Sequence, residues 1–152
     1  MKFGPVSLDQ ALGAISAHSV RLGDHVIKKG ARLTSDDLSA LRVEGRDHVI
    51  VAQLEADDIN EDQAAEALAA RICGAAIRMD RPSTGRVNLF AERAGVLRVD
   101  VARINALNAI DESVTFATLS DYRAVERGEM VATVKIIPFA VPQALVQQCC
   151  AC

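Results

Sequence analysis

Residues 130–137 read Met130-Val131-Ala132-Thr133-Val134-Lys135-Ile136-Ile137, and their alternation indicates a β-strand. Met130, Ala132, Val134 and Ile136 would share one face, with Thr133 and Lys135 on the other. A turn at residues 126–129 leads into this strand. We therefore expect a strand here with one apolar and one polar face.

Further short apolar segments predict more strands along the chain, at residues 48–52, 75–79, 86–90, 95–99 and 114–119. Residues 15–27 alternate loosely around Gly23-Asp24, which indicates a pair of strands joined by a turn. About three short helices are expected, near residues 35–44, 61–73 and 101–108. Irregularly spaced strands with helices between them favour an α+β fold, mostly antiparallel and β-rich, over a parallel βαβ array.

The first two helices have clear capping signals. Thr34 can cap the first helix, and Asp37 stands three residues later as a carboxylate variant of the capping box. Asn60 can cap the second helix, with Gln63 in the matching position. The second helix also has a small apolar face that suits close packing, formed by Ala64, Ala65, Leu68 and Ile72.

Composition limits the possible functions of the chain. Its 152 residues favour one domain, and its apolar and charged fractions of 50% and 24% are those of a globular protein. A net charge of -3 and an aromatic fraction of 3% disfavour nucleic-acid binding. We find no secretory signal and no apolar run long enough to span a membrane, so we expect a cytoplasmic protein.

The last ten residues resemble a helix that is cut off in mid-course. Leu145, Cys149 and Cys152 would share one helical face, and no residue that normally ends a helix follows them. We expect an accessory module at residues 1–140, and residues 141–152 as the start of a linker or helix leading to a missing domain. The tail would then be frayed or would pack on a neighbouring molecule. The cysteines fit buried helical positions better than a metal site, because paired CxxC motifs and a nearby histidine are missing.

Motifs for catalysis are missing as well. His18, His25 and His48 form no ligand or catalytic pattern, and a structural role is favoured for each. The serines lack a nucleophile-elbow sequence, and the chain has no glycine-rich phosphate loop of the known kinds. We therefore assign no catalytic residue and no metal ligand.

One segment has the composition of an anion site. The residues that could contribute are Arg81, Ser83, Thr84, Gly85, Arg86 and Asn88. Arginine side chains match phosphate geometry, and a glycine can leave backbone amides open to an anion. The alternative is a solvated turn that only reverses the chain.

Residues 20–54 resemble part of the molybdopterin molybdotransferase family. The similar residues are the string from Val26 to Thr34, followed by Asp37, Leu38, Leu41, Gly45 and Val49. The whole chain also resembles the amino-terminal region of bacterial proteins described as molybdopterin-binding. The segments that carry this wider resemblance are residues 84–91, 107–112 and 130–139.

The resemblance implies an accessory domain in molybdenum cofactor biosynthesis that helps to position molybdopterin or a molybdopterin nucleotide. No cofactor would be bound by this module directly. Molybdopterin would belong to the parent protein, and the partners would be downstream molybdopterin-binding and nucleotidyltransferase domains of the same chain. The Met-Asp-Gly-Tyr and Gly-Asp-Glu-Leu motifs of the molybdotransferases are absent, so the resemblance gives no catalytic residue. Alternatives are a scaffold or homo-oligomer-forming module without a ligand, and a small-molecule or sugar-binding β module.

Overall fold

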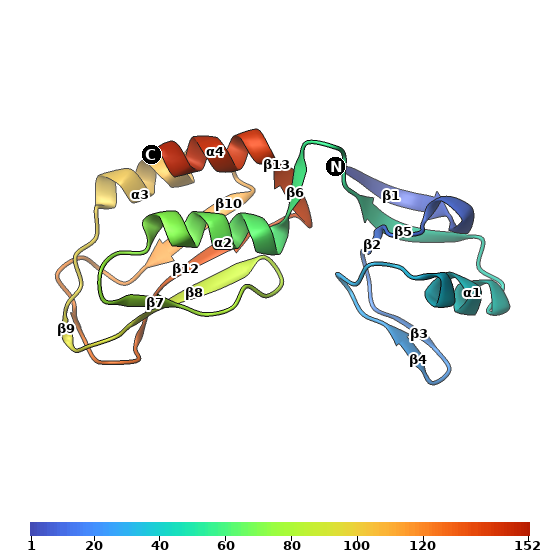
Figure 1. The fold of residues 1–152 in the computed structure, drawn as a ribbon, viewed down its shortest axis with the longest axis horizontal. Coiled ribbons are helices and arrows are strands. Elements are labelled where there is room, and N and C mark those ends of the chain that lie inside the picture. The colour runs from blue at the N-terminus through green and yellow to red at the C-terminus, as the bar shows by residue number, and fades with distance from the viewer. The chain divides into compact units, whose positions relative to one another are not determined.

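The computed structural model describes residues 1–152, which form two compact units, Met1–Ala56 and Asp57–Cys152 (Figure 1). All strand pairs are antiparallel and helices lie between them, so the expected α+β, β-rich fold class is confirmed. The expectation of a single domain is corrected, because the buried apolar residues form a separate core in each unit.

The first unit is built on a three-stranded sheet in the order β1-β5-β2. These strands are Lys2–Ser7, His48–Gln53 and Ile15–Ser16, and a 3₁₀ turn, η1, follows β1 at Leu8–Gln10. Strands β3 (Val20–Leu22) and β4 (His25–Ile27) form the expected hairpin around Gly23-Asp24. Helix α1 spans Ser35–Val43, also close to its expected range.

Strand β1 is the element of this unit that the sequence did not reveal. Gly4 and Pro5 interrupt its pattern, and both residues are poor strand formers. Proline is tolerated because β1 lies at the edge of its sheet, with β5 as its one partner. Pairing with β5 therefore overrides the local preference of these two residues.

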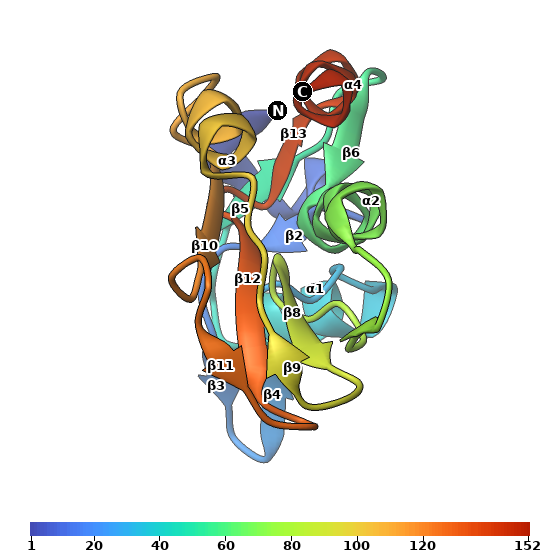
Figure 2. The ribbon, with the colours of Figure 1, turned by 90° about the vertical axis from the view of Figure 1, so that its left-hand side faces the viewer.

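The second unit contains a four-stranded sheet in the order β10-β12-β8-β7. These strands are Val114–Thr118, Met130–Ile136, Arg86–Ala91 and Ile77–Met79. Helix α2 (Glu61–Ile72) covers one face, α4 (Gln143–Ala151) packs beside α2, and α3 (Val101–Asn108) packs on β10 (Figure 2). Two short strand pairs complete the unit, namely β6 (Asp58–Asn60) with β13 (Ala140–Pro142) and β9 (Gly95–Val96) with β11 (Ala124–Val125).

The alternation in β12 is present with one exception. Val134 and Ile136 are buried, and Thr133 and Lys135 take the more open face, as expected. Met130 is exposed and Val131 is buried instead, because the register with β8 shifts between Met130 and Ala132. A β-bulge inserts an extra residue into one strand, which changes the face that the preceding side chains occupy.

The strand expected at residues 95–99 is shorter than predicted and ends at Val96. The following backbone amides bond to a turn instead. Leu97 donates to the carbonyl oxygen of Arg123, and Val99 donates to the carboxylate of Asp121 at 2.8 Å. These bonds lead the chain into α3, where Asp100 caps the helix.

The C-terminal segment is part of the second unit, and the boundary expected near residue 140 does not appear there. Strand β13 pairs with β6, and the amide of Gln143 donates to the carbonyl oxygen of Asp57. Val146 and Cys149 of α4 are buried in the core of the unit. The expectation of a frayed or externally packed tail is corrected, because apolar burial holds α4 within its own unit.

Thiol labelling tests the position of α4. Cys149 is 2% exposed, and burial raises the pKa of its thiol, whereas Cys152 is exposed. Because the thiolate is the reactive form and Cys149 is buried, we expect a maleimide to label Cys152 faster than Cys149 in the native protein and to label both after unfolding. Mass mapping of the labelled peptides measures both. Equal labelling rates at the two positions in native protein would show that α4 is not held in the core.

Candidate functional site

The candidate anion-binding loop joins β7 to β8 and turns next to the first turn of α2 (Figure 1). Ser83 and Arg86 exchange two backbone hydrogen bonds, at 2.9 and 3.1 Å. Thr84 and Gly85 between them have φ angles of 51° and 69°. Positive φ at both central residues is the geometry of a tight hairpin turn that favours glycine.

Gly85 and Asn88 are engaged inside the unit. The amide of Gly85 donates to Asp62 Oδ1 at 2.8 Å. Asn88 Nδ2 donates to Asp80 at 2.9 Å, and Asn88 Oδ1 accepts from Thr133 at 3.0 Å. The sequence hypothesis used Gly85 as a source of open amides, but here its amide attaches the turn to α2.

The positively charged side chains at this loop are arranged differently from expected, because Lys135 of β12 joins Arg86. Arg86 is directly opposite Lys135 in the register of β8 and β12. Lys135 Nζ donates to the carbonyl oxygen of Thr84 at 2.6 Å, and neither Arg81 nor Arg86 has a carboxylate partner. Like charges directly opposite each other on two strands are destabilising. The sequence did not show that Lys135 joins this group, because it lies far from the loop along the chain.

A cavity of about 800 Å³ lies in the second unit, near the other end of α2. Leu89, Val131 and Phe116 of the sheet line it, together with Leu107 of α3 and Cys149 of α4. Arg71, in the last turn of α2, also contributes to it, whereas Asp62 in the first turn holds the β7–β8 loop. The two candidate sites thus lie near opposite ends of α2. An α-helix rises about 1.5 Å per residue, so most of the length of α2 separates them.

Charged residues of the cavity are mainly basic. Its lining includes Arg71, Arg93, Arg98 and Arg103, against the single acidic residue Asp100. Arg71 Nε donates to the carbonyl oxygen of Cys150 at 3.0 Å. Arg103 and Asp100 are 3.5 Å apart, and Asp100 also accepts the amide of Arg103 as the cap of α3.

Arg98 and Arg93 differ in how they are held. Arg98 lies over the ring of Tyr122, 4.1 Å from its centre, and 3.4 Å from Asp121. Arg93 has no carboxylate or aromatic partner. The sequence did not reveal this site, because its residues come from segments spread between Arg71 and Cys152 and share no motif.

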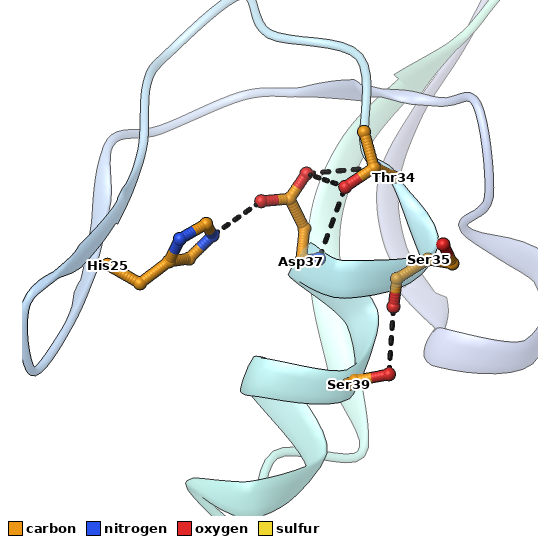
Figure 3. Close-up of polar contacts among 5 residues, drawn as sticks. All are labelled: His25, Thr34, Ser35, Asp37 and Ser39. Atoms are coloured by element: carbon orange, nitrogen blue, oxygen red, sulfur yellow. Dashed lines mark hydrogen bonds and ion pairs between the residues drawn. The ribbon is translucent and has the colours of Figure 1, made fainter.

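A partly buried polar contact in the first unit joins His25 and Asp37, whose side chains are 46% and 12% exposed (Figure 3). Thr34 and Asp37 form the predicted capping box at the start of α1, and His25 Nε2 of the hairpin lies 2.7 Å from Asp37 Oδ1. Burial would raise the pKa of Asp37, but hydrogen bonds from Thr34 and the adjacent His25 lower it below its usual range. The structural role favoured for His25 agrees with this geometry.

The chain contains no group of three or more His, Cys, Asp or Glu side chains that could hold a metal ion. None of the helices combines the length and the apolar character needed to cross a membrane.

Comparison with known proteins gives one match. Residues 5–53 are similar to a family described as a domain of unknown function, DUF8806. The match lies within the first unit, which contains the His25–Asp37 contact. No curated protein and no solved structure matches the chain.

The lowered pKa of Asp37 makes the stability of the first unit depend on pH. A carboxylate whose pKa is lower in the folded chain stabilises the fold above its unfolded pKa of about 3.9, and loses this effect as the pH falls. We expect Asp37→Asn to cost about 1–3 kcal/mol at neutral pH, because it removes a charged hydrogen-bond acceptor. Urea unfolding, followed through NMR signals of α1, measures the loss.

The difference between Asp37→Asn and wild type should shrink as the pH falls below about 4. Asp36→Asn is the control, because Asp36 is exposed in the same helical turn. We expect it to change the unfolding free energy by no more than about 0.5 kcal/mol. A loss for Asp37→Asn that stays constant with pH would contradict the role of its charge.

Gly85 gives a second stability test. A Cβ at this residue would lie 2.6 Å from the carbonyl oxygen of Ile136 and 2.8 Å from Glu61 Oε2. Gly128 also has a positive φ, but a Cβ there would meet nothing within 4 Å. We expect Gly128→Ala to cost about 1–2 kcal/mol from backbone strain alone. Gly85→Ala should cost about 1–3 kcal/mol more because of the clash. Equal melting temperatures for the two variants would contradict the close packing of the β7–β8 loop.

Proposed function

We propose that this chain is an accessory module in molybdenum cofactor biosynthesis, and that its β7–β8 loop contacts a phosphate of molybdopterin or of a molybdopterin nucleotide. The resemblance of residues 20–54, 84–91, 107–112 and 130–139 supports the pathway. The module is not itself catalytic and acts in the cytoplasm. It works with molybdopterin-binding and nucleotidyltransferase domains that carry the chemistry.

One observation carries the choice of site, namely the pairing of Arg86 with Lys135 across β8 and β12. Lys135 donates to the carbonyl oxygen of Thr84, but neither Lys135 nor Arg86 has a carboxylate partner that would offset the repulsion between them. A phosphate placed between them would be held by charge-assisted hydrogen bonds. Arg81 and Ser83 belong to the same loop and would add donors near the anion, whereas the hydroxyl of Thr84 donates to the carbonyl oxygen of Ser83 at 2.8 Å. Gly85 and Asn88 contribute by shaping the loop, since their polar groups already have partners.

Titration of the chain with a molybdopterin nucleotide, followed by calorimetry, tests the proposal. We expect Arg86→Ala to weaken binding about tenfold or more, which corresponds to about 1.4 kcal/mol or more. The melting temperature should change little, because Arg86 is exposed and holds no partner. Lys135→Ala should weaken binding in the same direction.

Arg127→Ala is the matched control for this titration. Arg127 is also exposed, but it lies in the turn before β12, whereas Arg86 pairs with Lys135 near the other end of that strand. It should therefore leave affinity unchanged. If Arg86→Ala also leaves affinity unchanged, the anion site is excluded and the scaffold or oligomerisation module becomes the better account.

A further inference from the structure

We propose that the cavity of the second unit binds an organic anion with an apolar body, such as an aliphatic or aromatic carboxylate, sulfonate or phosphate ester. This site is separate from the β7–β8 loop and does not depend on the function proposed for that loop.

The size of the cavity is the first argument. Protein interiors are close-packed, so a space of about 800 Å³ against core residues such as Leu89, Leu107 and Phe116 is not an ordinary packing defect. Its volume lies within the range of about 300–1,000 Å³ found for small-molecule sites. Elements from both layers of the unit surround it, since the sheet, α3 and the end of α4 all contribute.

The charges around the cavity determine the polarity of the ligand. Four arginines and one aspartate line it, although the chain as a whole has a net charge of -3. The carboxylate of Asp100 is engaged by the amide and the side chain of Arg103. Arg93 has no ionic partner, so its guanidinium group can receive an anionic group of the ligand.

The uncharged lining determines the body of the ligand. Thr118 is the one neutral side chain with a hydroxyl or amide group among the lining residues, and the others are aliphatic, aromatic, glycine or cysteine. A purine or pterin ring would find few side-chain partners for its many polar atoms, and burying such atoms without hydrogen bonds is costly. An alkyl or aryl group has no such requirement. The cavity therefore differs in ligand chemistry from the phosphate site proposed at the loop.

Backbone strain occurs around the same cavity. Ala76 lines it with a φ angle of 62°, and Tyr122, which stacks on Arg98, has a φ angle of 60°. Non-glycine residues adopt such angles at an energetic cost, and functional sites are where this cost is commonly found. Here the strained backbone at Tyr122 places the ring that holds Arg98 at the cavity.

Fluorescence titration with anilinonaphthalene sulfonate tests the proposal. We expect saturable binding of one probe per chain, and competition by decanoate but not by decanol. The uncharged analogue N-phenylnaphthylamine should bind more weakly than the sulfonate. Non-saturable binding of several probes per chain, or equal affinity for the charged and uncharged probes, would overturn the proposal.

Two variants locate the binding. Arg93→Ala should weaken binding of the sulfonate about tenfold, which corresponds to roughly 1.4 kcal/mol. It should change affinity for the uncharged analogue by less than about threefold, because that probe has no charge for Arg93 to contact. Ile104→Trp, which fills the cavity from α3, should abolish binding of both probes. If Ile104→Trp fails to fold, Arg93→Ala decides alone, because Arg93 is exposed and has no partner to lose.

Arg21→Ala is the control for these titrations, because Arg21 is an exposed arginine of the first unit. It should bind both probes as wild type does. If Arg93→Ala binds the sulfonate as tightly as Arg21→Ala does, the cavity does not select anions and the proposal is wrong.

Discussion

The close packing of α2 on the antiparallel sheet positions both candidate sites. Ala64, Ala65 and Ala69 are completely buried on this face, together with Leu68. Small side chains let the helix approach β8 and β12, and larger ones would push it away. At its first turn, Asp62 receives the amide of Gly85 and fixes the β7–β8 loop. At its last turn, Arg71 reaches the cavity. A shift of α2 would therefore change both sites together.

Local signals predicted local structure well. The capping residues Thr34, Asp37 and Asn60 mark the starts of α1 and α2, because a side chain that caps a helix lies within three residues of the amide it accepts from. Long-range pairing was harder to foresee. The division after Ala56 and the pairing of β13 with β6 depend on contacts between segments about 80 residues apart, for which a short apolar pattern gives no information.

In the candidate sites too, residues that are adjacent in sequence could be predicted, whereas residues brought together by the fold could not. Arg81, Ser83, Thr84, Gly85, Arg86 and Asn88 were found because they are adjacent in sequence, but Lys135 entered the group through the register of β12. The cavity could not be found in this way, because Arg71, Arg93 and Cys149 meet only after α2, α3 and α4 are placed on the sheet. The positive φ angles of Ala76, Thr84 and Tyr122 also depend on this tertiary context, since none of the three is a glycine.

In the proposed function, the Arg86–Lys135 pair on β8 and β12 holds a phosphate of the pterin ligand. The most direct measurement is NMR mapping of backbone amides during titration of the labelled chain with a molybdopterin nucleotide. We expect saturable shifts at residues 83–87 and at Lys135, with smaller changes in the first unit. Saturable shifts confined to other residues, with residues 83–87 unmoved at saturation, would contradict it.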